Sequence, residues 1–172
     1  MVLCSVDCVE KIAQYLGVPG RKIYMSENNI VASDNIVKNQ TIEGFGTIVQ
    51  ALVKDSKNQD VLGKNKIEQA LTKQWLEYAV LYLNYGDIPT NAKKILKELN
   101  GVLQKNTYIC GTNLTIADIV FFHTLHPTMN NLTYQEKAQY INVSRWFDNV
   151  QQNENLRQKL NLIDFNLMYL YL

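Results

Sequence analysis

The stretch Asn113-Leu114-Thr115-Ile116-Ala117-Asp118-Ile119 predicts where the central helix of this chain begins. Thr115 followed three residues later by Asp118 forms a capping box. In this motif the hydroxyl binds a free amide of the first turn, and the carboxylate binds the amide of Thr115. Leu114 precedes the cap and Ile119 takes the fourth helical position, so the two side chains are expected to close over the helix start as a hydrophobic staple.

The residues after the cap predict a helix from Ile116 to about Leu125 that is apolar on nearly every side. Such a helix has no face suited to water, so it should be buried all round at the centre of the core. Capping boxes occur in many unrelated proteins. The motif therefore predicts a fold element and no particular chemistry.

The chain has 172 residues, of which 47% are hydrophobic and 19% charged, and its net charge is +1. This balance is typical of a soluble globular protein. A net charge near zero gives no general attraction to nucleic acid or to an anionic membrane. The sequence contains no apolar run of about 18 residues, which a membrane-spanning helix needs, and residues 1–9 do not resemble a signal peptide.

The first third of the chain predicts a small α+β layer. Apolar residues at helical spacing indicate a helix from Val6 to Leu16. Two β-favouring pairs, Ile30-Val31 and Ile36-Val37, predict a hairpin that turns at Ala32–Asn35. A second helix is expected from Ile42 to Val53. This layer is too small to bury a core by itself.

The rest of the chain predicts helices only. A polar linker is followed by a helical stripe that begins at Ile67 and includes Trp75, Tyr78 and Tyr82. Further helices are expected after Thr90, at the central stretch, after Thr133 and after Asn142. A last helix should carry Leu156, Leu160 and Ile163, and the apolar segment from Phe165 to Leu172 is expected to pack on something.

Three cysteines, Cys4, Cys8 and Cys110, form no CxxC pair, so free thiols in a reducing compartment are expected. Cys4 and Cys8 lie four residues apart at the first helix, and a helix amino terminus can lower the pKa of a thiol and make it a nucleophile. The alternative, which we prefer, is that Cys8 faces the core. No suitable strand precedes this helix to form the wall of an active site.

Two further patterns have both a functional and a structural interpretation. His123 and His126, three residues apart on one helix, could share a metal ion, but the chain has no other histidine, and core histidines without a metal are preferred. The aromatic residues Trp75, Tyr78 and Tyr82 could stack on nucleic-acid bases. A core stripe is the commoner use of this spacing, and the lysines of residues 93–97 fit a solvated helix face.

Arg145 is the residue that most suggests more than packing. The neighbouring Trp146 and Phe147 should anchor its helix, so the guanidinium is held on a rigid base about 100° from the buried stripe. A fixed arginine suits bidentate capture of a partner's carboxylate. An intramolecular salt bridge to Asp148 or Glu154 explains the same spacing equally well.

The order of these parts resembles the glutathione transferase fold, most specifically at Tyr108–Gly111 followed by the capping box Leu114–Asp118. The resemblance implies a thioredoxin-like α+β layer in residues 1–56, reduced and missing its first strand. It further implies a linker in residues 57–66 and an all-helical domain in residues 67–172.

Within this fold, one family fits closely: translation elongation factor 1 epsilon, also called the third auxiliary, multifunctional component of the multi-aminoacyl-tRNA synthetase complex. The resemblance covers nearly all of the chain and is strongest from Leu62 to Leu160. It is carried by the following stretches: Gln74–Tyr78, Leu114–Ile119, Leu132-Thr133 with Gln135–Lys137, and Asn142–Phe147.

The family resemblance implies a non-catalytic adaptor that uses no cofactor and no metal. It would dock on the transferase-like domain of methionyl-tRNA synthetase with one face and on that of glutamyl-prolyl-tRNA synthetase with another, alongside other components of the complex. A cytoplasmic location and a nuclear role in the DNA-damage response are also implied. No direct contact with nucleic acid or a membrane is expected, and a tRNA-binding role has little support from the charge.

The resemblance also implies which residues dock. Arg145 matches the family's arginine on the second docking face. For the first face, transferase-dimer geometry points to the second helix and to the helix that holds Trp75. Exposed positions on these helices are expected to be Gln50, Val53, Gln74 and Tyr78.

The competing hypothesis is an active glutathione transferase. Transferases of this fold resemble one another in a proline before the third strand and in an acidic-Ser pair at the start of the second helix. Here Asn29-Ile30-Val31 has no proline, and Glu43-Gly44 lacks the hydroxyl. The strand with the catalytic residue is also hard to find before Val6. These departures favour an adaptor over an enzyme.

Overall fold

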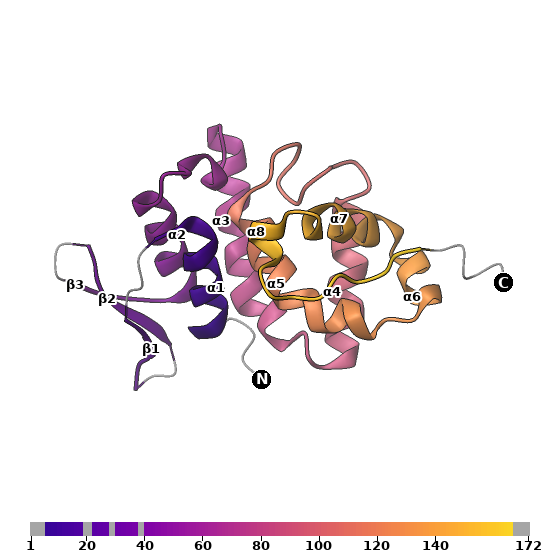
Figure 1. Cartoon of the computed structure of the whole chain (residues 1–172), viewed down its shortest axis with the longest axis horizontal. Helices are drawn as coiled ribbons and strands as arrows, with labels where there is room; N and C mark the ends of the chain where they lie inside the picture. The colour runs from indigo at the N-terminus through magenta and orange to yellow at the C-terminus, as the bar shows by residue number, and fades with distance from the viewer. Residues whose placement is uncertain (1–5, 19–21, 28–29, 38–39, 167–172) are drawn as a thin grey trace.

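The computed structural model describes residues 6–18, 22–27, 30–37 and 40–166, which form an α+β layer and a helical part (Figure 1). The expected absence of a first strand concerns residues before Val6, which lie outside the described range. The α+β layer consists of these elements: α1 (Val6–Leu16), β1 (Ile23–Met25), β2 (Val31–Val37), β3 (Gln40–Glu43) and α2 (Phe45–Asp55).

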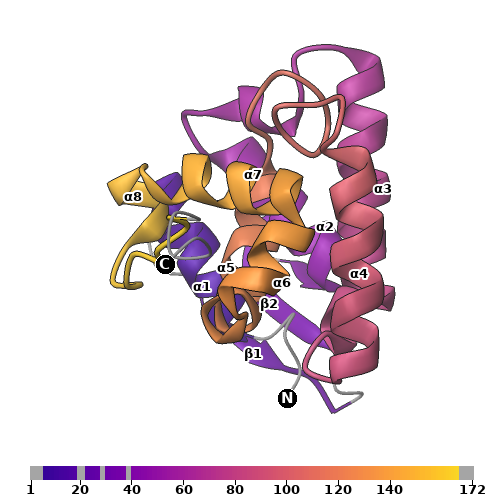
Figure 2. The ribbon, with the colours of Figure 1, turned by 90° about the vertical axis from the view of Figure 1, so that its right-hand side faces the viewer.

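The helical part follows in the order expected from the sequence. In Figure 2, α3 and α4 lie along one side of the molecule, and α7 packs against both α4 and α5. No helix in the described ranges is long and apolar enough to span a membrane. The elements are η1 (Gln59–Leu62), α3 (Lys66–Leu81), η2 (Leu83–Tyr85), α4 (Pro89–Val102), α5 (Ile116–Asn131), α6 (Tyr134–Gln139), α7 (Ile141–Gln151) and α8 (Glu154–Arg157).

The central helix is α5, and its first eleven residues, 116–126, are all buried. It packs on α1, α3 and α7, so it joins the α+β layer to the helices. A single hydrophobic cluster includes Ile12 of α1, Leu52 of α2 and Phe121 of α5. The buried central helix is confirmed. The division of the chain near residues 56 and 67 stays a prediction, because one core crosses it.

The capping box forms at the start of α5, and its carboxylate has two further partners. Asp118 Oδ2 accepts hydrogen bonds from the amide of Thr115 at 2.8 Å and from its hydroxyl at 2.9 Å. Asp118 Oδ1 accepts from the amide of Ile109 and from Nε1 of Trp146, both at 2.9 Å. Leu114 packs against the core that contains Ile119. One buried acid therefore joins the loop before α5, the start of α5, and α7.

The hairpin prediction is wrong. Residues 32–35 lie within the single strand β2 and form no turn, and β2 is the middle strand of an antiparallel sheet in the order β1-β2-β3. Ser33 pairs with Ile23 on one side and with Ile42 on the other. The Asp34 carboxylate, which suggested a turn, accepts hydrogen bonds from Tyr24 Oη at 3.0 Å and Thr41 Oγ1 at 2.9 Å. Neighbouring strands therefore satisfy the polar residue.

Two helix boundaries also differ from the prediction. Helix α2 begins at Phe45 because Ile42 belongs to β3, and Gly44 turns the chain with a φ of 96°, a conformation that favours glycine. Helix α5 continues through Pro127 to Asn131, beyond the expected end near Leu125. A proline removes one intrahelical hydrogen bond, but the fully buried Met129 keeps the next turn packed in the core.

Two apolar stripes were predicted only in part. In α3 the buried positions are Glu68, Thr72, Leu76 and Ala79, so Ala79 of the predicted stripe is buried, whereas Leu71, Trp75 and Tyr78 are only partly buried against the core. Ile67 is 74% exposed, and Tyr82 is exposed as well. The last helix is short, because α8 ends before Gln158, whose φ of 54° is incompatible with a continued helix. Leu160 and Ile163 follow in irregular structure.

Replacing Asp118 with alanine should destabilise the chain strongly. The substitution leaves the amides of Ile109 and Thr115 and the Trp146 indole buried without an acceptor. We therefore expect a loss of about 3 to 5 kcal/mol in the free energy of unfolding, measured by urea denaturation. Thr115→Ala, which keeps the carboxylate, should cost only about 0.5 to 2 kcal/mol. Equal losses in the two variants would contradict the role given to the carboxylate.

Candidate functional site

Arg145 lies on α7 with its guanidinium over the end of α4. Its Nη2 atom donates to the carbonyl oxygens of Leu103 at 2.7 Å and Asn106 at 2.9 Å. Leu103 is the C-cap of α4, so the cation sits at the negative end of that helix. The side chain is exposed, and no hydrogen bond or ion pair of Nε or Nη1 is found among the described residues. The arginine is thus held at one edge and free at the other.

The intramolecular alternative for Arg145 is not what the structure shows. Within the described ranges, the arginine forms no ion pair with Asp148 or Glu154. The Asp148 carboxylate instead accepts hydrogen bonds from the side chains of Gln151 at 2.7 Å and Gln152 at 3.2 Å. Arg145 is bound only to main-chain carbonyl groups, which leaves its charge without an acidic partner in this part of the chain.

A second contact joins the two helices, and here a side chain of α4 reaches the start of α7. Its N-cap residue, Tyr140, makes no side-chain capping bond. Asn100 of α4 takes this role, because its Oδ1 atom accepts from the amides of Asn142 at 2.9 Å and Val143 at 3.3 Å. The Asn142 side chain donates back to the Asn100 carbonyl oxygen at 3.2 Å. No local spacing in the sequence points to Asn100, because this cap is supplied by another helix.

The four residues expected on the first face are not equivalent. Gln74 is exposed on α3, and Gln50 is half-buried on α2 with its amide bonded to the Gly46 carbonyl oxygen at 3.1 Å. Val53 is 0% exposed, so the expectation that it lies at the surface is wrong. Its position on α2 belongs to the stripe that faces the core.

Tyr78, the fourth residue, is half-buried beside Gln74 on α3. Its hydroxyl donates a hydrogen bond to the Glu98 carboxylate of α4. Burial, together with this carboxylate, raises the pKa of Tyr78. Its ring lies 5.1 Å from that of Trp75 and 4.8 Å from that of Tyr82. Tyr78 is therefore a fixed part of the surface between α3 and α4.

An exposed apolar surface continues from Tyr78 and was not predicted. It lies on the end of α3, on η2 and on the turn before α4. A small cavity of about 200 Å³ opens there between Tyr78 and Ile95. The predicted stripe in α3 carried more apolar residues than one buried face needs, which is the signal that could have revealed this surface. Its exposed members are Leu81, Tyr82, Tyr85 and Ile88.

The cysteines that the structure describes are unsuited to nucleophilic chemistry. Burial raises the pKa of the Cys8 thiol to about 11, and its Sγ lies 3.9 Å from Thr124 Oγ1. Burial also raises the pKa of Cys110, which receives a hydrogen bond from Thr72 at 3.6 Å. Thiolates are the reactive form, so neither thiol is activated at neutral pH. The inward orientation predicted for Cys8 is confirmed, whereas Cys4 lies outside the described residues.

The two histidines have different environments on α5. His126 Nε2 is hydrogen-bonded to the Asn161 carbonyl oxygen at 2.9 Å. His123 is 6% exposed, and neither of its ring nitrogens has a hydrogen-bond partner among the described residues. Burial lowers the pKa of His123 to about 4, and the charges of Lys11 and His126 act in the same direction. The ring is therefore neutral at physiological pH.

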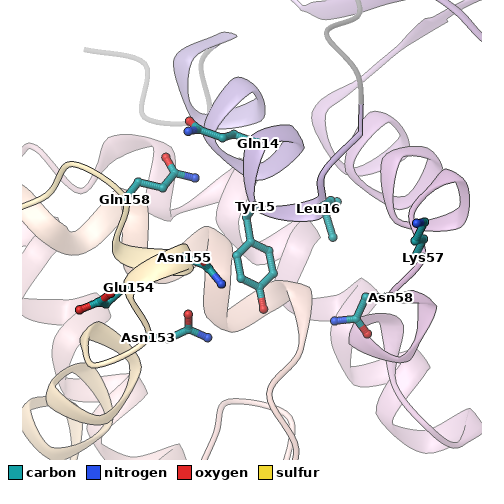
Figure 3. A pocket seen from close by; sticks show the side chains of 9 residues that line it. All are labelled: Gln14, Tyr15, Leu16, Lys57, Asn58, Asn153, Glu154, Asn155 and Gln158. Carbon is teal, nitrogen blue, oxygen red and sulfur yellow. The ribbon is translucent and has the colours of Figure 1, made fainter.

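A polar cleft of about 520 Å³ lies between the end of α1, the turn after α2, and α8 (Figure 3). Tyr15 is in the middle of the view, with Asn153 and Asn155 on the α8 side and Asn58 opposite. Carboxamides dominate the lining, which contains no cysteine, serine or histidine. The lining residues of this cleft therefore do not form a Ser–His or Cys–His pair of the kind used in hydrolysis or thiol transfer.

Comparison with known proteins identifies the family. A family model described as nuclear-export cofactor Arc1p matches residues 68–154. The chain is also 37% identical over 131 residues to eukaryotic translation elongation factor 1 epsilon-1 of Cricetulus griseus, covering 76% of this chain and 75% of the relative. The chain belongs to the elongation factor 1 epsilon family. This confirms the family predicted from the sequence.

Relatives at lower identity include a tRNA ligase and a protein that interacts with the tRNA synthase complex. The bifunctional glutamate/proline–tRNA ligase of Cricetulus griseus is 27% identical over 135 residues, which cover 76% of this chain and 8% of the ligase. Aminoacyl tRNA synthase complex-interacting multifunctional protein 2 of Rattus norvegicus is 28% identical over 107 residues, covering 61% of this chain and 30% of the relative.

Among solved structures, a glutathione S-transferase from Pichia kudriavzevii superimposes with a TM-score of 0.69 and 15% identity, covering 95% of this chain and 91% of the transferase. At this identity the likeness concerns the fold alone. The transferase-like fold predicted for the elongation factor 1 epsilon chain is confirmed.

The buried His123 should make the stability of the chain depend on pH. Its pKa is about 4 in the folded chain and 6.5 as the ordinary value, so the unfolded chain binds the proton more readily between these limits. Stability is therefore full above pH 6.5 and falls as the pH drops toward 4.

The measurement is urea denaturation at pH 7.0 and pH 4.5, compared with a His123→Leu variant. Between these pH values the wild-type chain should lose about 2 to 3 kcal/mol more than the variant. Other groups titrate in both chains and cancel in the comparison. The same loss in wild type and variant would exclude His123 as the cause.

Proposed function

We propose that this chain is a non-catalytic adaptor of the multi-aminoacyl-tRNA synthetase complex and that it supports translation. Family membership supports the synthetase-associated role, since relatives include a glutamate/proline–tRNA ligase and a complex-interacting protein. The observation that carries the docking mechanism is Arg145, whose guanidinium is fixed by two carbonyl groups and free along its Nε and Nη1 edge. A fixed, exposed guanidinium is suited to binding an anionic group of a partner, and it is neither a nucleophile nor a base.

The second face of the adaptor is centred on Arg145, and its proposed partner is the transferase-like domain of glutamyl-prolyl-tRNA synthetase. The free edge of the guanidinium matches the two oxygens of a carboxylate, and a bidentate pair adds both energy and direction. Little side-chain entropy is lost on binding, because the two intramolecular bonds already hold the arginine. The proposed contact is therefore a carboxylate of the partner seated against α7 and the end of α4.

The first face is proposed for the transferase-like domain of methionyl-tRNA synthetase. Gln50, Gln74 and Tyr78 remain its candidate residues, and the exposed aromatic side chains near Tyr78 extend it. Apolar and aromatic surface of this kind is common at the centres of protein interfaces. The first face is centred on α3 and the second on α7, so both partners can be bound at once, and each contact raises the local concentration of the other.

The remaining expectations rest on the family resemblance and are carried forward as proposals. They are the absence of a cofactor, a cytoplasmic location and a nuclear role in the DNA-damage response. Retention on glutathione resin, or conjugation of a chlorinated aromatic substrate above the buffer rate, would instead favour the alternative, an active transferase. The raised pKa of Cys8 and the glycine at the start of α2 both argue against that activity.

Substitution of Arg145 should weaken the second contact alone. Arg145→Lys keeps the charge but lacks the planar fork, and Arg145→Ala removes both. We expect the affinity for the glutamyl-prolyl-tRNA synthetase domain to fall by about 2 to 5 kcal/mol in Arg145→Ala and by less in Arg145→Lys. Calorimetric titration measures both, and binding of the methionyl-tRNA synthetase domain should be unchanged.

Arg157→Ala is the matched control for these variants. Arg157 also donates to a main-chain carbonyl group, that of Gln151 at 3.0 Å, but it lies on α8. Its loss should leave both contacts unaffected. If Arg145→Ala and Arg157→Ala bind the synthetase domain as the wild type does, Arg145 is not a docking residue.

A negative charge on the exposed part of α3 should weaken the first contact. Gln74→Glu changes one group of an exposed side chain, so it should barely affect folding. It places a negative charge in the proposed interface, and this charge would have to lose its water when the partner binds. Pull-down with the methionyl-tRNA synthetase domain should show reduced recovery, and recovery of the second partner should persist. Glu77→Gln, on the same helix, tests whether removal of a charge has the opposite effect.

A further inference from the structure

We infer that Asn100 is the positioning residue for Arg145 and thereby sets the affinity of the second face. The effect on affinity rests on the proposed docking function. The hydrogen bonds by which Asn100 would position Arg145 belong to the free chain. Asn100 lies on α4 and is hydrogen-bonded to the first turn of α7. Its side-chain oxygen accepts from two consecutive amides, those of Asn142 and Val143.

The two contacts between α4 and α7 are reciprocal. Asn100 of α4 caps the amino-terminal end of α7, and Arg145 of α7 binds the carbonyl groups at the carboxy-terminal end of α4. The first contact supplies acceptors to free N–H groups, and the second supplies a donor to free C=O groups. Each helix therefore satisfies the end of the other, and the two ends are fixed in one register.

This register determines where the free edge of Arg145 lies. Arg145 follows Asn142 by three residues, about one helical turn, so a shift of the first turn moves the guanidinium with it. The cap of α7 has no local substitute, because Tyr140 makes no side-chain capping bond. Loss of the Asn100 acceptor would leave the amides of Asn142 and Val143 without this partner. The buried Val143 and Ser144 still hold the turn in the core, but its outer side would loosen, and the direction of the Arg145 side chain would be less well defined.

The inward side of α7 is held independently of Asn100. Trp146 and Phe147 are fully buried, and the Trp146 indole is bound to Asp118. The helix should therefore stay folded when Asn100 is replaced. What changes is the first turn and the solvent-facing side chain that depends on it, so the effect of Asn100 on docking can be separated from its effect on folding.

The test compares Asn100→Ala with Asn100→Asp and Asn91→Ala. Asn100→Asp keeps an oxygen acceptor for the two amides, so this variant should bind the synthetase domain more tightly than Asn100→Ala does. Asn91 is a second asparagine of α4, and its amide bonds to the Tyr85 carbonyl oxygen at 3.3 Å, away from α7. Asn100→Ala should weaken binding of the glutamyl-prolyl-tRNA synthetase domain by up to about tenfold, because a mobile arginine loses side-chain entropy when the partner fixes it.

A double-mutant cycle shows whether Asn100 acts through Arg145. In an Arg145→Ala background, Asn100→Ala should cause no further loss of affinity, because the side chain that it positions is gone. A full additional loss in that background would overturn the inference. So would unchanged binding by Asn100→Ala in the wild-type background.

The free chain gives an independent measurement. In Asn100→Ala, amide hydrogen exchange at Asn142 and Val143 should become faster, and the Arg145 Nε–H relaxation should report a more mobile guanidinium. A rigid Arg145 in this variant would overturn the positioning role. If the wild-type chain does not bind the synthetase domain, the proposed docking fails, and these two measurements on the free chain still decide whether Asn100 positions Arg145.

Discussion

The buried carboxylate of Asp118 is the constraint on which the rest of the structure depends. It accepts four hydrogen bonds from three separate segments: the loop at Ile109, the cap at Thr115 and the indole of Trp146. Removal from water raises the pKa of this carboxyl group, and the hydrogen bonds act against the shift. A buried acid of this kind is stable only with all its partners in place, so it selects one arrangement of the helical part.

The Asp118 contact also reaches the proposed docking surface. Trp146 is held inside by Asp118, and the next residue toward the amino terminus is Arg145, which faces outward over the end of α4. Helix α7 is thus fixed from the core by the indole, at its first turn by Asn100, and at its surface by the arginine. A side chain fixed from several directions loses little freedom when a partner binds, which is the physical basis of a preorganised contact.

Two features of the described residues differ from what glutathione transferase chemistry is expected to use. The thiol of Cys8 is buried with a raised pKa, and α2 begins after a glycine with positive φ where a hydroxyl would be needed. Both features fit the proposed adaptor role, in which the fold is a rigid support for two separate docking faces and no reactive group is needed.

Sequence alone determined the features that local spacing encodes. The sequence correctly predicted the capping box at Thr115 and Asp118, the buried α5, the extent of α1 and the family. The residues concerned interact with near neighbours in the chain or match a family pattern. Tertiary structure decided what depends on distant partners. Asp34 became part of a strand because Tyr24 and Thr41 satisfy its carboxylate, Val53 turned inward with α2, and Asn100 capped a helix that begins some forty residues later. Contacts of this kind leave no periodic signal, since the two partners are brought together only when the core forms.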